Sequence, residues 1–144
     1  MISKRMLFTL AVFIIFFVSG TRAQTSHIAE LKNFDKPVEV REFPNGKLEL
    51  IKVGEVMIGK ATFFPGWKWS ESVQPLAKTK SCEAPHFQYH VSGILKIKMD
   101  DGTEIECRPG DVSYLPSGHD GWVVGDEPVV VIDFQGMMDY AKSK

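Results

Sequence analysis

The chain lacks the charge pattern of a protein that binds nucleic acids or anionic membranes. Its 144 residues carry 17 Lys and Arg against 18 Asp and Glu, a net charge of −1, and no run or stripe of basic residues is present. Loss of Lys4, Arg5 and Arg22 with an N-terminal leader would leave fourteen basic residues and a net charge of −4. Because binding to phosphate-rich partners depends on clustered positive charge, such partners are poor candidates.

Other common signatures are missing as well. The sequence has no internal repeat, no low-complexity tract and no phosphate-cradling glycine loop, and no Ser/His/Asp or paired-carboxylate spacing is specific enough to name an activity. No segment beyond the N-terminal leader shows a sustained helical period, which disfavours a helical bundle. The length that remains is that of one domain.

The N-terminus has the composition of a secretory signal peptide. Lys4 and Arg5 precede an apolar run over residues 6–18, and Thr21-Arg22-Ala23 offers small residues at the positions that a signal peptidase reads. The run is shorter than the about 20 apolar residues of a membrane-spanning helix; the alternative is an uncleaved anchor. We predict a signal peptide over residues 1–23, cleavage after Ala23 and export to a periplasm or the cell exterior.

The rest of the chain consists of short strand-like segments separated by turn residues, which predicts an all-β fold. We expect an irregular arm over residues 24–37, a β domain over 38–136 and a tail with one or two helical turns over 137–144. Pro44-Asn45-Gly46 contains the Asn-Gly pair of a tight hairpin. The pattern is typical of an antiparallel sandwich or barrel.

The two cysteines, Cys82 and Cys107, have several open roles. An oxidising compartment would permit a disulfide between them, and this bridge would add about 3 kcal/mol to stability in the chain-entropy view. Cys82 is otherwise a candidate metal ligand or a small buried apolar residue.

The second half of the chain resembles the cupin family, whose two signatures are G-x5-H-x-H-x3,4-E-x6-G and G-x5-P-x-G-x2-H-x3-N. Gly110, Pro116 and Gly118 match the second signature in register, and six residues separate His86 from Gly93, which puts His86 at the position of the family's Glu. The resemblance is strongest over residues 82–134. It implies a jelly-roll barrel with a site in its mouth, usually a metal site, and a homodimer formed through edge strands.

The metal ligands of these signatures are only partly retained. With the shorter spacer, the first two His positions fall on Lys80 and Cys82, while the later His position is Gly121, with His119 two residues before it. We therefore predict Cys82, His86 and His119 as the ligands of a divalent metal. A Cys/His/His set with an open fourth position suits zinc better than manganese, and loss of the carboxylate disfavours iron.

Three further polar residues are predicted to contact a small-molecule ligand. Gln88 and His90 alternate with His86 on one strand face, and Asp120 follows His119, where it would replace or support that ligand.

Three functional hypotheses follow. The chain is a metal-dependent enzyme acting on a small polar metabolite, a binding module that holds a small molecule with or without metal, or a structural cupin in which a Cys82–Cys107 disulfide takes the place of the metal. No further acid or base stands out in the sequence, so no catalytic residue is assigned.

Overall fold

The computed structural model describes residues 28–142. The expected signal peptide, residues 1–23, lies outside the described residues, as do residues 24–27 and 143–144. Within residues 28–142, no helix is long and apolar enough to cross a membrane. The segment before the first strand, residues 28–38, contains a turn at residues 34–35 and no strand.

Strands dominate the described part of the chain. They are β1 (Glu39–Phe43), β2 (Gly46–Val53), β3 (Val56–Phe63), β4 (His86–Ser92), β5 (Ile94–Met99), β6 (Glu104–Cys107), β7 (Val112–Leu115), β8 (His119–Val124) and β9 (Val129–Asp133). Two short helices, α1 (Trp69–Ser72) and α2 (Gln74–Ala77), follow β3.

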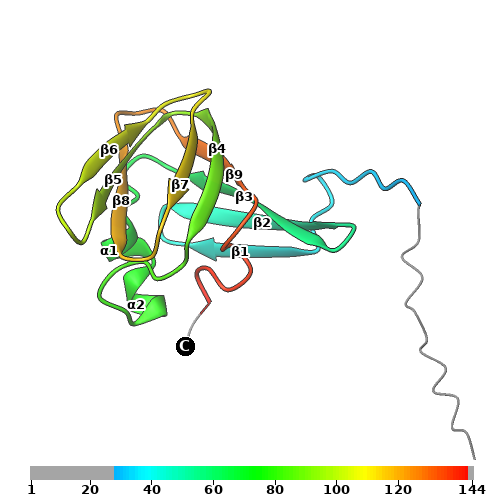
Figure 1. Ribbon diagram of the computed structural model, residues 1–144, viewed down its shortest axis with the longest axis horizontal. Coiled ribbons are helices and arrows are strands. Elements are labelled where there is room, and N and C mark those ends of the chain that lie inside the picture. The colour runs from blue at the N-terminus through cyan, green and yellow to red at the C-terminus, as the bar shows by residue number, and fades with distance from the viewer. Residues whose placement is uncertain (1–27, 143–144) are drawn as a thin grey trace, which may run out of the picture.

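The strands form two antiparallel sheets that enclose a barrel (Figure 1). The larger sheet has six strands in the order β1-β2-β3-β9-β4-β7, and the smaller has three in the order β6-β5-β8. The helices α1 and α2 lie at one end of the barrel, where the segment leading into β4 and the C-terminal segment also run (Figure 1). The predicted all-β class and jelly-roll barrel are confirmed.

The hydrophobic core lies between the two sheets because strand residues alternate between an inner and an outer face. In the larger sheet, Leu50, Val129 and Val131 point inward and are 0–1% exposed. In the smaller sheet, Leu95 and Ile97 are also buried in this core. Alternating apolar residues in β2, β5 and β9 therefore account for the barrel's interior.

The turn between β4 and β5 requires a glycine at position 93. Gly93 has a φ of +68°, a region in which a Cβ atom is unfavourable, and a Cβ there would lie 2.7 Å from the carbonyl oxygen of Pro128. Gly102, in the turn between β5 and β6, has a φ of +91°, but a Cβ there would meet nothing within 4 Å. Gly93 is thus constrained by both conformation and contact, and Gly102 by conformation alone.

Two segments differ from the expectation based on sequence. The segment after β3 forms α1 and α2, which have four residues each and are too short to produce a periodic pattern. The C-terminal segment forms turns, so the predicted helical turns are wrong. Its carbonyl oxygens are used differently: those of Met137, Met138 and Tyr140 accept hydrogen bonds from the Arg41 guanidinium at 3.2, 2.7 and 2.5 Å. These bonds attach the C-terminal segment to β1.

Replacing Gly93 with Ala should lower the free energy of unfolding by about 2–5 kcal/mol, because the left-handed φ costs about 1–2 kcal/mol and the clash with Pro128 about 1–3 kcal/mol. Gly102→Ala is the matched control and should show only the conformational cost of about 1–2 kcal/mol. Urea denaturation of the three proteins measures both changes. Equal losses in the two variants would contradict the role assigned to the Pro128 contact.

Candidate metal site

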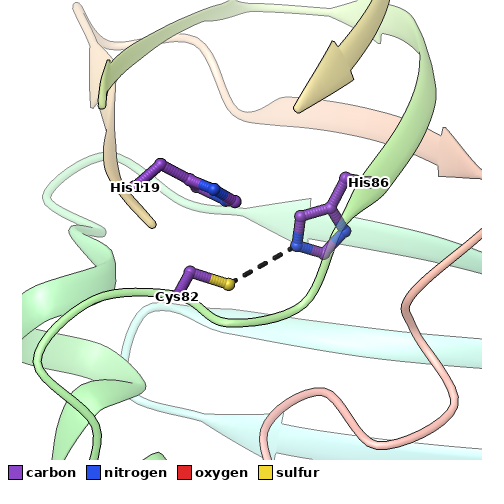
Figure 2. Close-up of side chains that lie close together, drawn as sticks. All are labelled: Cys82, His86 and His119. Carbon is purple, nitrogen blue, oxygen red and sulfur yellow. Dashed lines mark hydrogen bonds between the residues drawn. The ribbon is translucent and has the colours of Figure 1, made fainter. Parts of the chain in front are cut away.

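A short bridge between two chain segments brings the candidate ligands together. The Cys82 amide donates to the carbonyl of His119 at 2.8 Å, and the Gly118 amide donates to the carbonyl of Cys82 at 2.7 Å. His119 begins β8, and His86 begins β4 after the chain turns at residues 83–85. The three side chains point toward one another from these separate segments (Figure 2).

The ligand atoms form a compact and buried cluster. The Sγ atom of Cys82 and a ring nitrogen of each histidine all lie within 4.8 Å of one another, and Sγ is 3.6 Å from Nε2 of His86. Cys82, His86 and His119 are 2%, 3% and 4% exposed. Within residues 28–142, no other group of three such side chains lies as close together.

Hydrogen bonds on the far side of each imidazole direct its Nε2 into the cluster. His86 Nδ1 lies 2.5 Å from the Oδ2 atom of Asp133, and His119 Nδ1 lies 2.8 Å from the carbonyl oxygen of Pro116. A carboxylate and a backbone carbonyl only accept hydrogen bonds, so both Nδ1 atoms carry the proton. Each Nε2 is therefore the nitrogen that would bind a metal after releasing any proton it carries, as in the carboxylate–histidine–metal arrangement of many metal sites.

Asp133 is the central supporting residue, and it was missed in the sequence analysis. Its side chain is 0% exposed. Oδ2 accepts from His86 Nδ1 and from Gln88 Nε2 at 3.1 Å, and Oδ1 accepts from the Gln135 amide at 2.6 Å. The signal was available: Asp133 follows the inward-facing Val129 and Val131 at a spacing of two, so it falls on the inner face of an apolar strand.

The metal-free cluster favours a thiolate beside an imidazolium. Burial alone would raise the pKa of Cys82, but hydrogen bonds from His119 and His86 outweigh it and lower this pKa to about 6. Burial would likewise lower the pKa of His86, but the hydrogen bonds to Asp133 and Cys82 raise it to about 9. Between these two values the cluster holds a negative sulfur next to a positive ring, so the sulfur is already in its metal-binding state.

The spacing of the donor atoms fits a tetrahedral metal. Bonds of about 2.3 Å to sulfur and about 2.0–2.1 Å to nitrogen, at a tetrahedral angle, put the two ligand atoms about 3.6 Å apart. The distance from Cys82 Sγ to His86 Nε2 is 3.6 Å. The chemistry of the donors and this distance both fit a divalent metal.

A small cavity of about 20 Å³ adjoins the three ligands. Gln88 from β4 lines it, as do Met137 and Tyr140 from the C-terminal segment and the apolar residues of the core. The ring of Tyr140 is centred 5.5 Å from that of His86, edge to face. Because one water requires about 10–15 Å³ by this measure, the cavity has room for a water-sized ligand and no more.

The structure places His90 and Asp120 outside the lining of this cavity, and their predicted contacts with a ligand stay predictions. His90 lies further along β4, where its Nε2 is 2.8 Å from Ser113 Oγ. Burial there lowers the pKa of this histidine. The Oδ1 atom of Asp120 accepts hydrogen bonds from the backbone amides of Ser70 and Gly121 at 3.1 and 2.8 Å. Asp120 thereby joins α1 to β8.

Both cysteines are free thiols. Cys107 ends β6 and pairs with Leu95, whereas Cys82 pairs with His119 in the bridge described above. Burial raises the pKa of the Cys107 thiol. The structure therefore has no disulfide between Cys82 and Cys107. The surroundings of the two thiols differ, because they lower the pKa of Cys82 and raise that of Cys107.

No protein-family model matches the sequence, and no curated protein matches it. Solved structures do match. A sugar phosphate isomerase of the cupin superfamily from Silicibacter pomeroyi is 17% identical, with a TM-score of 0.52 and 72% of this chain and 73% of that chain covered. KdgF from a Halomonas species is 19% identical, with a TM-score of 0.48 and coverage of 69% and 89%. A cupin-like protein from Thermotoga maritima is 15% identical, with a TM-score of 0.45 and coverage of 65% and 69%. At these identities the likeness is one of fold.

The thiol of Cys82 should titrate near pH 6 in the metal-free protein, because its pKa is lowered to about 6. Below that pH the sulfur is protonated, and above it the thiolate absorbs in the far ultraviolet. A Cys107→Ser background isolates the signal, Cys82→Ser should abolish it, and His119→Gln should move the midpoint upward. A midpoint at the ordinary cysteine value of about 8.5 would contradict the assignment.

Proposed function

We propose that this chain, which has the cupin fold, binds one divalent metal ion through Cys82, His86 and His119 and a small ligand at the remaining coordination position. The observation that carries the proposal is the convergence of three buried donor atoms whose imidazole rings are both oriented by hydrogen bonds at Nδ1. A histidine that binds a metal usually donates its other ring N–H to a carboxylate or a backbone carbonyl in this way.

Zinc is the metal that this donor set favours. One thiolate and two imidazoles form a set common to zinc sites, whereas manganese prefers oxygen donors. The Asp133 carboxylate accepts hydrogen bonds from His86, Gln88 and Gln135, so it supports the His86 ligand and is itself not a metal ligand in this proposal. When bound, zinc supplies Lewis acidity at its open position.

Gln88 sets the hydrogen-bonding character of the small ligand. Its Nε2 donates to the carboxylate of Asp133, and a flipped amide would place its oxygen against that acceptor, so the orientation of the amide is determined. Its Oε1 is buried and has no partner among the described residues, and Gln88 lines the cavity. Because an amide oxygen only accepts, a ligand that contacts it needs an O–H or N–H group, as water has.

The size of the cavity favours metal binding over turnover of a metabolite. Pockets for small metabolites measure about 300–1,000 Å³, against about 20 Å³ here. Entry of a metabolite would require Met137 and Tyr140 to move away from the ligands. A metal-binding protein with a water-sized ligand is therefore our first candidate, and a metal-dependent enzyme whose C-terminal segment opens is the second.

His86→Gln should reduce the zinc content from one ion per chain to almost none, because it removes a ligand. His90→Gln, at the other buried histidine of β4, is the matched control and should retain the ion. Asp133→Asn should keep the site but weaken zinc binding about 10–100-fold, since the support of His86 is lost. Elemental analysis after zinc loading and dialysis, with chelator competition for affinity, measures all three. Full zinc content in His86→Gln, or equal loss in His90→Gln, would overturn the ligand assignment.

We also propose that the chain is exported, on the strength of the basic start, the apolar run and the small residues before Gln24. Expression with its own N-terminus in a bacterium should give protein outside the cytoplasm that begins at Gln24, as read by N-terminal sequencing. Replacing Ala23 with a bulky residue should slow that cleavage. An intact Met1 on membrane-bound protein would show an uncleaved anchor and contradict the proposal.

A further inference from the structure

The C-terminal segment, residues 135–142, covers the candidate metal cluster at one end of the barrel. Its Met137 and Tyr140 are 3% and 6% exposed, and both line the cavity beside the cluster. Met137 packs onto β3 at Gly59, where a Cβ would lie 2.7 Å from its Cγ. The segment forms turns and bends and pairs with no strand of the described chain, so no sheet holds its backbone in place.

An outer pocket of about 130 Å³ lies on the other side of this segment. Tyr140 and Ala141 line it from the segment, and Ala84 lines it from the turn before β4. Three residues, Trp69, Cys82 and Tyr140, line both this outer pocket and the inner cavity. They therefore form the partition between the two spaces, and one of them is a proposed metal ligand.

The groove beside Trp122 is a less suitable way into the cavity. It measures about 300 Å³ and shares only Trp67 with the inner cavity. The ring of Trp67 is stacked on that of Phe63, with centroids 3.9 Å apart, and its backbone is bonded to Phe64 and Val123. That partition is fixed by stacking and by backbone bonds, and no member of the cluster lines the groove.

Arg41 of β1 fastens the C-terminal segment over the cluster. Its Nη atoms donate to the carbonyls of Met137, Met138 and Tyr140 at 3.2, 2.7 and 2.5 Å, and its Nε donates to Glu39 at 2.7 Å. The Arg41 side chain is only 9% exposed. Hydrogen bonds from a charged donor are stronger than neutral ones, and the planar guanidinium can hold several acceptors at once. Arg41 therefore fixes the backbone of both residues that cover the cavity.

The beginning of the segment is attached independently of Arg41. The amide of Gln135 donates to Asp133 at 2.6 Å. Gly136 has a φ of +92° and packs so closely on the Pro85 carbonyl that a Cβ would overlap its oxygen. Movement of the segment away from the cluster would therefore break the Arg41 bonds and leave the attachment at residues 135–136 in place.

We propose that the C-terminal segment is a gate that sets the size of the molecules reaching the cluster. They pass from the outer pocket between Tyr140 and Cys82, and Arg41 is the positioning residue that keeps the gate closed. The closed gate leaves room for a water-sized ligand, and displacement of Tyr140 joins the inner cavity to the outer pocket. Because apolar side chains form most of the outer pocket, the gate admits small uncharged molecules. The inference rests on the proposed function for the metal, but the gate itself requires none.

The reactivity of the Cys82 thiol in metal-free Cys107→Ser protein tests the gate. Two uncharged reagents, the small methyl methanethiosulfonate and the bulky aromatic dithiodipyridine, are both attacked by the thiolate at sulfur. Arg41→Gln should speed the bulky reagent about tenfold or more, and the small one much less, because charge-assisted bonds that hold the gate are lost. Arg41→Lys should fall between, since an ammonium lacks the planar fork. The ratio of the two rates cancels any change in the nucleophilicity of the thiol.

Matched variants separate the gate from general loosening. Arg108→Gln, at an exposed arginine paired with Glu106, should leave both rates unchanged. Tyr140→Ala should abolish the size selectivity, whereas Tyr140→Phe retains the ring and should preserve it. The Cys107 thiol, measured in a Cys82→Ser background, reports opening of the rest of the barrel and should not respond to Arg41→Gln. Circular dichroism of each variant verifies folding.

Four outcomes would overturn the proposal. They are equal acceleration of both reagents in Arg41→Gln, the same acceleration in Arg108→Gln, a matching rise in the reactivity of Cys107, and unchanged selectivity in both Arg41→Gln and Tyr140→Ala. Since no metal is present in these measurements, failure of the metal proposal, which zinc content reveals, is distinguished from failure of the gate.

Discussion

The fully buried carboxylate of Asp133 is the interaction on which the site depends. A charge at the centre of an apolar core is costly unless hydrogen bonds replace its water. Three N–H groups do so here, from His86, Gln88 and the backbone of Gln135. The same three bonds link β9 to β4 and to the start of the C-terminal segment, and they fix the imidazole and the amide that face the cavity. The Asp133 carboxylate therefore connects β9 to β4 and also orients the side chains of the site.

Strand β4 serves two surfaces through simple alternation. His86, Gln88 and His90 point into the barrel, and Phe87, Tyr89 and Val91 point outward. The inner row carries the polar side chains of the site, and the side chains of the outer row are 42–45% exposed. A one-residue shift in the register of β4 would exchange these rows. In the observed register, Gln88 lies opposite both Asp133 and Ser113, so His86 and Gln88 face the cavity.

The sequence was informative about the fold because turn residues have local, conformational requirements. Gly93, Gly110 and Gly118 all adopt positive φ, and these are the glycines on which the resemblance rested. Helices α1 and α2 and the turns after β9 were not predictable in the same way. They depend on distant contacts, such as Asp120 with Ser70 and Arg41 with the carbonyls of the tail.

The same turn residues also made part of the site predictable. Cys82, His86 and His119 could be proposed from their positions in the turn frame. The alternation of β9 indicates that Asp133 faces inward, but its contact with His86 could not be predicted from the sequence. Asp133 and Tyr140 are distant in sequence and reach the cluster only through strand order and the path of the C-terminal segment. A glycine occupies position 121, where the second signature has a histidine. His119 instead approaches from the preceding turn.

X-ray absorption at the zinc edge of the loaded protein tests the central claim most directly. The account predicts one sulfur at about 2.3 Å, two imidazole nitrogens at about 2.0–2.1 Å and one further light atom. Cys82→Ser should remove the sulfur contribution, while Cys107→Ser should leave the spectrum unchanged. A first shell made only of oxygen and nitrogen in the wild type, or one in which Cys107 supplies the sulfur, would contradict it.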